Sequence, residues 1–158
     1  MEVTDGHGVQ PGDRYVLLVE DNPDDAELTL RAFKRHNLAN KVVLARDGVE
    51  ALDFIFGRGS FNGRDVAQLP SLILLDINMP RLNGHEVLAA LRAEALTQNT
   101  PVVMLTSSDE SRDIHRAYSG GANSYVRKPV EFAEFIEAAG QLGVYWLLLN
   151  RAPEGKGG

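Results

Sequence analysis

Short apolar runs recur along the chain, each about as long as one β-strand. They span residues 15–19, 42–45, 72–75, 102–105 and 124–126. Most are rich in β-branched residues, and their apolar positions are consecutive rather than alternating. Continuous runs of this length are typical of strands in a parallel sheet whose two faces are both covered.

Between these runs, apolar residues follow a helical period among charged ones. We predict helices over residues 24–36, 47–56, 83–95, 110–119 and 131–149. In the first of them Ala26, Leu28 and Phe33 lie among charges, and Pro23 suits a first helical turn. Strands and helices alternate five times, which predicts an α/β fold with right-handed crossovers.

One domain accounts for the chain, over residues 15–150. Residues 1–14 contain three glycines and a proline among polar residues, and we expect a flexible N-terminal lead. Residues 151–158 are rich in proline and glycine and predict a flexible tail. The connection 57–70 is longer than usual, and its glycines favour neither helix nor strand.

Charge and cysteine content remove several classes of function. The formal charge of −6 argues against a general nucleic-acid binder, which needs a basic surface. The absence of cysteine excludes disulfides, zinc–thiolate sites and thiol catalysis. The sequence contains neither an apolar run of membrane-spanning length nor a signal peptide, so we expect a cytoplasmic protein without membrane contact.

Polar residues with complementary chemistry follow four of the predicted strands. The first strand leads into Glu20 and Asp21, the third into Asp76, the fourth into Thr106 and the fifth into Lys128. The carboxyl ends of parallel strands share one edge of the sheet, where ligands bind in open α/β folds. Ordinary loop polarity is the alternative explanation, but it does not account for four strands ending in matched groups.

These residues predict chemistry on a phosphoryl group. Clustered carboxylates repel one another unless a cation is present, and Mg²⁺ prefers a few carboxylates completed by water and phosphate oxygens. Lys128 can pair with a carboxylate or a phosphoryl oxygen, and the Thr106 hydroxyl can donate a hydrogen bond to the same group. Together they suit phosphoryl transfer to a carboxylate nucleophile.

Four motifs resemble those of response-regulator receiver domains in two-component signalling, in order and at the family's spacing. They are Val16-Leu-Leu-Val-Glu-Asp-Asn22, Leu74-Leu-Asp-Ile-Asn-Met-Pro80, Met104-Leu-Thr-Ser107 and Tyr125-Val-Arg-Lys-Pro129. The resemblance extends from Tyr15 into the final helix. It implies a flavodoxin-like (βα)5 fold, in which a five-stranded parallel sheet has the order 2-1-3-4-5 with strands numbered along the chain.

The resemblance also implies roles for individual residues. Asp76 is the expected phosphoacceptor, and the expected Mg²⁺ ligands are Asp21, Asp76 and the backbone carbonyl of Asn78, with Glu20 acting through water. Lys128 and Thr106 are the expected catalytic partners of Asp76, and the peptide bond before Pro129 is expected to be cis. The phosphoryl donor would be a sensor histidine kinase, and the domain would catalyse only its own phosphorylation and dephosphorylation.

Thr106 and Tyr125 are the expected switch residues, and each also has a simpler explanation. Thr106 could cap the segment that follows it, and Tyr125 could be an ordinary half-buried strand aromatic. Both simpler roles are compatible with switching. The four histidines, His7, His36, His85 and His115, lack partners at metal-ligand spacing, so we interpret them as surface residues.

The last predicted helix is apolar on every side after Gly143. This stretch includes Tyr145, Trp146, Leu148 and Leu149, whereas packing one helix face on a sheet needs only an apolar stripe. We expect a homodimer through this helix, formed on the face that it shares with helix 110–119 and strand 124–126. The alternative is a monomer whose last turns fold back onto the sheet. With the long 57–70 connection, this extension most resembles receivers paired with bacterial phytochromes.

Three other functions fit the sequence less well. A phosphohydrolase of the haloacid-dehalogenase type needs a second acid two residues after its nucleophile, where this chain has Asn78. A flavodoxin-like FMN binder needs a phosphate-binding first loop, whereas residues 20–25 are acidic. A DNA-binding regulator needs a second domain, which the sequence after Leu149 does not provide.

Overall fold

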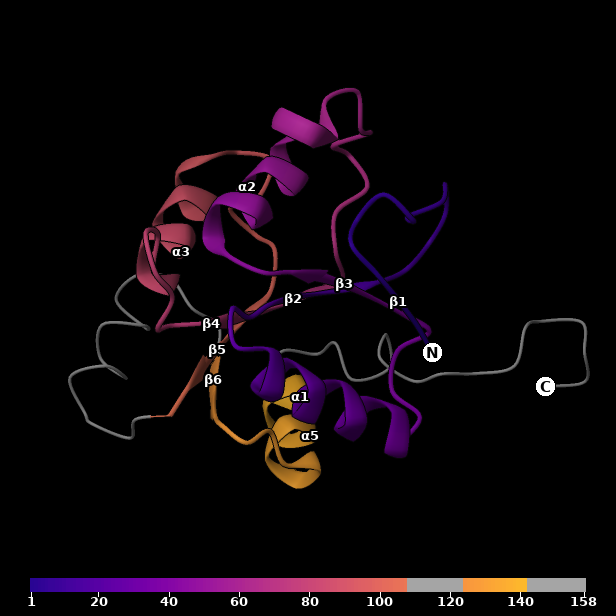
Figure 1. The fold of residues 1–158 in the computed structure, drawn as a ribbon, viewed down its shortest axis with the longest axis vertical. Coiled ribbons are helices and arrows are strands. Elements are labelled where there is room, and N and C mark those ends of the chain that lie inside the picture. Colours follow the sequence, from indigo (N-terminus) through magenta and orange to yellow (C-terminus); the bar gives the residue numbers. More distant parts are fainter. Residues whose placement is uncertain (108–123, 142–158) are drawn as a thin grey trace, which may run out of the picture.

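A parallel sheet with helices on both faces forms the body of the molecule, in a computed structural model that describes residues 1–107 and 124–141 (Figure 1). The strands are β1 Glu2–Thr4, β2 Val16–Val19, β3 Lys41–Ala45, β4 Leu72–Asp76, β5 Val102–Thr106 and β6 Ser124–Arg127. The helices are α1 Pro23–Arg35, α2 Gly48–Phe56, the short 3₁₀ helix η1 Gly59–Phe61, α3 Gly84–Ala93 and α5 Phe132–Gln141.

The strand order β1-β3-β2-β4-β5-β6 confirms the predicted topology and adds one strand to it. If β1 is set aside, the other five strands have the order 2-1-3-4-5, and all neighbouring pairs are parallel. The sheet therefore has six strands where we expected five.

The additional strand comes from residues 1–14, which we expected to be a flexible lead. Glu2 pairs with Lys41 at the start of β3, and the register continues through Thr4. The Lys41 ammonium is 2.6 Å from Asp13 Oδ2 and 3.2 Å from Glu2 Oε1, and it donates to the carbonyl of Gly8 at 2.8 Å. One buried cation thus binds three points of the N-terminal segment to the sheet, a contact that its polar composition did not reveal.

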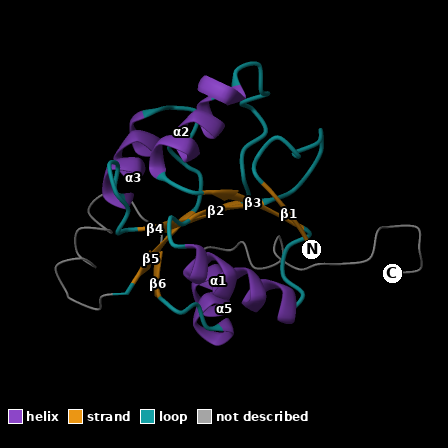
Figure 2. Ribbon diagram, in the orientation of Figure 1, coloured by secondary structure: helices purple, strands orange, loops and turns teal. Residues whose placement is uncertain are grey.

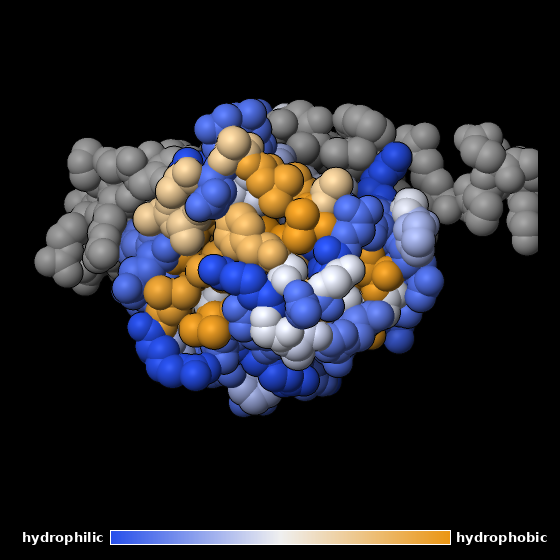
Figure 3. All heavy atoms as spheres, turned by 90° about the horizontal axis from the view of Figure 1, so that it is seen from above, coloured by the Kyte–Doolittle hydropathy of each residue, from blue (hydrophilic) through white to orange (hydrophobic). Residues whose placement is uncertain are grey.

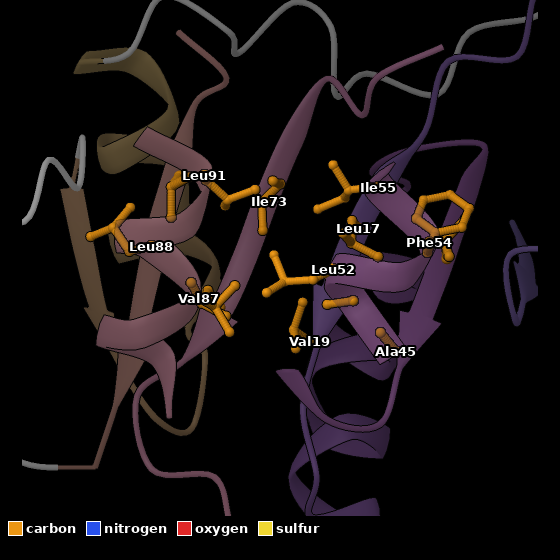
Figure 4. Close-up of a cluster of buried hydrophobic side chains, with 14 of the residues drawn as sticks. Leu17, Val19, Ala45, Leu52, Phe54, Ile55, Ile73, Val87, Leu88 and Leu91 are labelled. Carbon is orange, nitrogen blue, oxygen red and sulfur yellow. The ribbon is translucent and has the colours of Figure 1, made fainter. Parts of the chain in front are cut away.

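Helices α2 and α3 cover one face of the sheet, and α1 and α5 cover the other (Figure 2). Alternate residues of each strand enter two separate cores, because successive strand side chains point to opposite faces. Leu17 and Ile73 belong to the α2/α3 core (Figure 4), whereas Leu18 and Leu74 belong to the α1/α5 core. Burial on both faces is why the strands appear in the sequence as continuous apolar runs.

Local sequence signals define the helix starts. The Asn22 side chain accepts hydrogen bonds from the amides of Asp24 and Asp25, Pro23 occupies the first turn, and α1 begins there. Asn83 and Glu86 form a capping box at the start of α3. Helix α3 ends at Ala93, two residues before the predicted end, because Glu94 is extended.

The connection 57–70 contains η1 and is held against the α2/α3 core. The Tyr15 hydroxyl donates to the Gln68 carbonyl at 2.6 Å, and the Arg64 guanidinium lies 3.9 Å from the centre of the Phe54 ring. The surface above this region, seen in Figure 3, mixes hydrophobic and hydrophilic residues.

Three predictions lie partly or wholly outside the described residues: helix 110–119, the last turns of helix 131–149, and the tail 151–158. None of the helices within residues 1–107 and 124–141 combines the length and apolar character needed to cross a bilayer.

Candidate functional site

Three carboxylates gather at the carboxyl ends of β2 and β4. Glu20 and Asp21 follow β2 directly, and Asp76 is the last residue of β4. One oxygen from each lies within 4.8 Å of the other two. Glu20 and Asp76 are buried, whereas Asp21 is exposed. The cluster is therefore open to solvent on the side of Asp21. The sequence predicts this cluster, because all three residues lie at the ends of apolar strands.

The turn after β4 holds Asp76 in place. The Asn78 amide donates to Asp76 Oδ1 at 3.2 Å, and the Gly84 amide donates to the Ile77 carbonyl at 2.9 Å. A β-carbon on Gly84 would overlap the backbone carbonyl of Asp76 and lie 2.8 Å from the α-carbon of Ile77. Glycine is therefore required for α3 to begin so close to the acceptor.

Lys128 lies immediately after β6, and its side chain points into the carboxylate cluster. The peptide bond between Lys128 and Pro129 is cis, as expected. The Lys128 ammonium is 2.9 Å from Asp25 Oδ2, 3.0 Å from Glu20 Oε1 and 3.3 Å from Asp76 Oδ1. One lysine thus bridges the candidate acceptor, a buried acid and a residue of α1.

Burial and neighbouring charges shift the pKa values of both Asp76 and Lys128. Burial is the main cause that raises the pKa of Asp76 to about 8. A hydrogen bond with Glu20 and the negative charge of Glu20 add to this rise, whereas Lys128 and the Asn78 amide oppose it. Burial alone would lower the pKa of Lys128, but its hydrogen bonds to Asp25 and Glu20 raise it above the ordinary value. Asp76 therefore resists ionisation unless more positive charge enters the cluster.

A hard divalent cation fits this donor set. The three clustered groups offer only oxygen ligands, and the open side at Asp21 leaves room for water or a phosphate oxygen. Asn78 is exposed beside the cluster, two residues after Asp76.

The two predicted switch residues lie on neighbouring strands. Thr106 is the buried last residue of β5, and its backbone carbonyl accepts the Lys128 amide at 2.8 Å. Tyr125 in β6 is half-buried and packs against the α2/α3 core, opposite Met104 in the sheet. The predicted dimer residues Tyr145, Trp146, Leu148 and Leu149 lie outside the described residues.

The contact between Asp25 and Lys128 was not anticipated from the sequence. Asp25 lies in the first turn of α1, where an acidic residue is expected simply because it favours the helix dipole. The acidic run 20–25 was visible, but only the fold shows that its last carboxylate reaches Lys128.

Comparisons with known proteins point to one family. A family model described as "Response regulator receiver domain" matches residues 16–140. The probable methanogenesis regulatory protein FilR2 of Methanothrix harundinacea is 40% identical over 139 residues, which cover 87% of this chain and 86% of that protein.

Two solved structures are similar to the chain over most of its length. The bacteriophytochrome response regulator AtBRR has a TM-score of 0.79 at 49% identity, covering 89% of this chain and 100% of that one. The phosphorylated cyanobacterial phytochrome response regulator RcpA has a TM-score of 0.69 at 31% identity, covering 86% of this chain and 95% of that one. With the carboxylate cluster at the strand ends, these matches establish that the chain belongs to the response regulator receiver domain family.

Proposed function

We propose that this receiver domain accepts a phosphoryl group on Asp76 from a sensor histidine kinase. The observation that carries the proposal is the position of Asp76, which is 1% exposed at the end of β4 with an acidic pair and Lys128 around it. Resistance of Asp76 to ionisation makes it dependent on added positive charge, which ties its reactivity to a bound cation.

The transfer needs one new bond and one broken bond. A carboxylate oxygen of Asp76 attacks phosphorus, the bond from phosphorus to the donor imidazole nitrogen breaks, and the freed imidazole keeps the electron pair. Lys128 and Thr106 would then meet the phosphoryl oxygens through the ammonium and the hydroxyl. In the reverse modification, water attacks phosphorus, the bond from phosphorus to the Asp76 oxygen breaks, and inorganic phosphate leaves, which restores the carboxylate.

Mg²⁺ is the proposed cofactor. Asp21, Asp76 and the backbone carbonyl of Asn78 would hold it directly, and Glu20 would act through a water molecule. When bound, the ion neutralises charge on the cluster and on the transferring group.

The donor we propose is a phytochrome-like kinase, and transfer takes place in the cytoplasm. Support comes from AtBRR and RcpA, which are both response regulators of phytochromes and align with most of this chain.

Intact-mass measurement after incubation with acetyl phosphate and Mg²⁺ tests the acceptor. We expect the wild type to gain one phosphoryl group, and Asp76→Asn to gain none. Asp65→Asn, which alters an exposed carboxylate of the 57–70 connection, is the matched control and should behave as wild type. Modification of Asp76→Asn at the wild-type rate would refute the assignment, and so would undiminished modification in EDTA.

Phosphorylation would act through Thr106 and Tyr125. The Thr106 hydroxyl would move toward the phosphoryl group, and Tyr125 would enter the space that it leaves, which shifts an existing two-state equilibrium. The NMR signals of the backbone amides in β5 and β6 should therefore change when beryllofluoride binds. Unchanged spectra would exclude the switch.

A homodimer through the final helix is the proposed assembly, on the surface that includes β6 and α5. It is supported by the apolar run that contains Tyr145, Trp146, Leu148 and Leu149, with Trp146 as the central contact. Sedimentation at micromolar concentration should give a dimer, and Trp146→Ala should weaken it. A monomeric wild type contradicts the dimer, and unchanged affinity in Trp146→Ala contradicts the role of that residue.

A further inference from the structure

The ammonium group of Lys128 is shared among three carboxylates. A lysine ammonium offers three N–H groups, and three carboxylates lie within ion-pair distance of it. The distance to Asp25 is 2.9 Å and that to Asp76 is 3.3 Å, so the candidate acceptor is the more distant of the two. The hydrogen bonds of Lys128 go to Glu20 and Asp25, so a phosphoryl oxygen on Asp76 would compete with these two carboxylates for the ammonium.

The three partners differ in their access to water. The side chains of Glu20 and Asp76 are 0% and 1% exposed, whereas that of Asp25 is 34% exposed. A buried carboxylate that loses its cation keeps an uncompensated charge, which costs several kcal/mol. A partly exposed carboxylate can exchange the ammonium for water at a much smaller cost.

Asp25 is also fixed in position by the start of α1. The Asn22 side chain accepts the Asp25 amide at 3.1 Å, which sets the first turn of the helix. Among the described carboxylates, Asp25 lies outside the acidic cluster formed by Glu20, Asp21 and Asp76. It contacts the lysine without belonging to the candidate metal site.

We infer that Asp25 is a positioning residue that holds Lys128 in the resting site and releases it when a phosphoryl group arrives. The inference rests on the proposed function, because it concerns how Lys128 is shared between Asp25 and a modified Asp76. Asp25 competes with the phosphoryl group for the ammonium. Removal of its charge therefore favours the phosphorylated arrangement.

The affinity for beryllofluoride at saturating Mg²⁺, followed by fluorine NMR, tests the inference. Asp25→Asn should bind beryllofluoride about two- to five-fold more tightly than wild type, the range for loss of one partly exposed ion pair. The matched control is Asp24→Asn, which removes the same charge from the same helical turn but from a residue that is not one of the three Lys128 partners. Its affinity should equal that of wild type.

A double-mutant cycle with Lys128→Ala shows whether Asp25 acts through the lysine. The gain from Asp25→Asn should vanish in the Lys128→Ala background, and Asp25→Glu should return the affinity toward the wild-type value because it restores a carboxylate.

Several results would overturn the inference. The first is an affinity of Asp25→Asn for beryllofluoride that is equal to or weaker than that of the wild type. The second is an equal gain in affinity in Asp24→Asn, and the third is a gain from Asp25→Asn that persists in the Lys128→Ala background. A wild-type protein that neither binds beryllofluoride nor gains a phosphoryl group would instead overturn the proposed function, and the inference with it.

Discussion

Asp76→Asn should stabilise the metal-free protein, although it removes the candidate acceptor. Asp76 is buried beside Glu20, and burial is the main cause that raises its pKa to about 8, against an ordinary value of 3.8. An asparagine has nearly the same shape and carries no charge. The substitution therefore removes the cost of placing a second buried carboxylate in the cluster.

The sign and size of the effect follow from proton binding. Between pH 3.8 and about 8 the folded chain keeps the Asp76 proton while the unfolded chain releases it, so rising pH destabilises the folded protein across this window. At or above about pH 8 the full pKa difference corresponds to at most about 6 kcal/mol. Lys128 and local relaxation reduce this cost. We therefore expect the free energy of unfolding of Asp76→Asn to exceed that of the wild type by about 2–5 kcal/mol near pH 8 and by about 1 kcal/mol near pH 5.

Urea denaturation of both proteins in EDTA, followed by circular dichroism across this pH window, measures the difference. Saturating Mg²⁺ should narrow or reverse this difference in stability, because a free Mg²⁺ concentration of 100 times the Kd stabilises the wild type by about 2.7 kcal/mol. A wild type more stable than Asp76→Asn in EDTA, or a difference that does not change with pH, would refute the argument that Asp76 ionises at a cost.

Three further substitutions, one of them with a control, test the fold. Gly84→Ala should lower the free energy of unfolding by about 1–3 kcal/mol in urea, because its β-carbon overlaps the carbonyl of Asp76. As the control, Gly140→Ala on α5, where a β-carbon meets no atom of the described residues within 4 Å, should leave the free energy of unfolding unchanged or raise it by up to about 1 kcal/mol. Phe135→Ala should cost about 3–5 kcal/mol in the same assay, because this buried ring packs on a phenylalanine of α1; a loss below about 1 kcal/mol would contradict that packing. Lys41→Met should speed hydrogen exchange of the β1 amides, and unchanged exchange would show that the lysine does not hold this strand.

The strands that could be predicted are those that share a repeating sequence pattern, a short apolar run. Five strands were found from their apolar runs because each is buried on both faces, and polar residues after those runs identified Glu20, Asp76, Thr106 and Lys128. The parallel arrangement then brought the strand ends to one edge.

The remaining features depend on contacts between distant segments. Strand β1 has only three residues, two of them polar, and the buried Lys41 that binds it is indistinguishable in the sequence from a surface lysine. Asp25 likewise looked like an ordinary acid of a first helical turn. Its contact with Lys128 joins residues 103 positions apart, which no local pattern encodes.

Chemical trapping of the modified residue tests the central claim most directly. Borohydride reduces an acyl phosphate to an alcohol, so treatment after acetyl phosphate and Mg²⁺ should convert Asp76 into homoserine, which peptide mass spectrometry locates. Homoserine at position 76 alone is the result that we predict. Homoserine at Asp21 or Asp25, or its absence from a protein that has gained a phosphoryl group, would contradict the assignment of Asp76 as the acceptor.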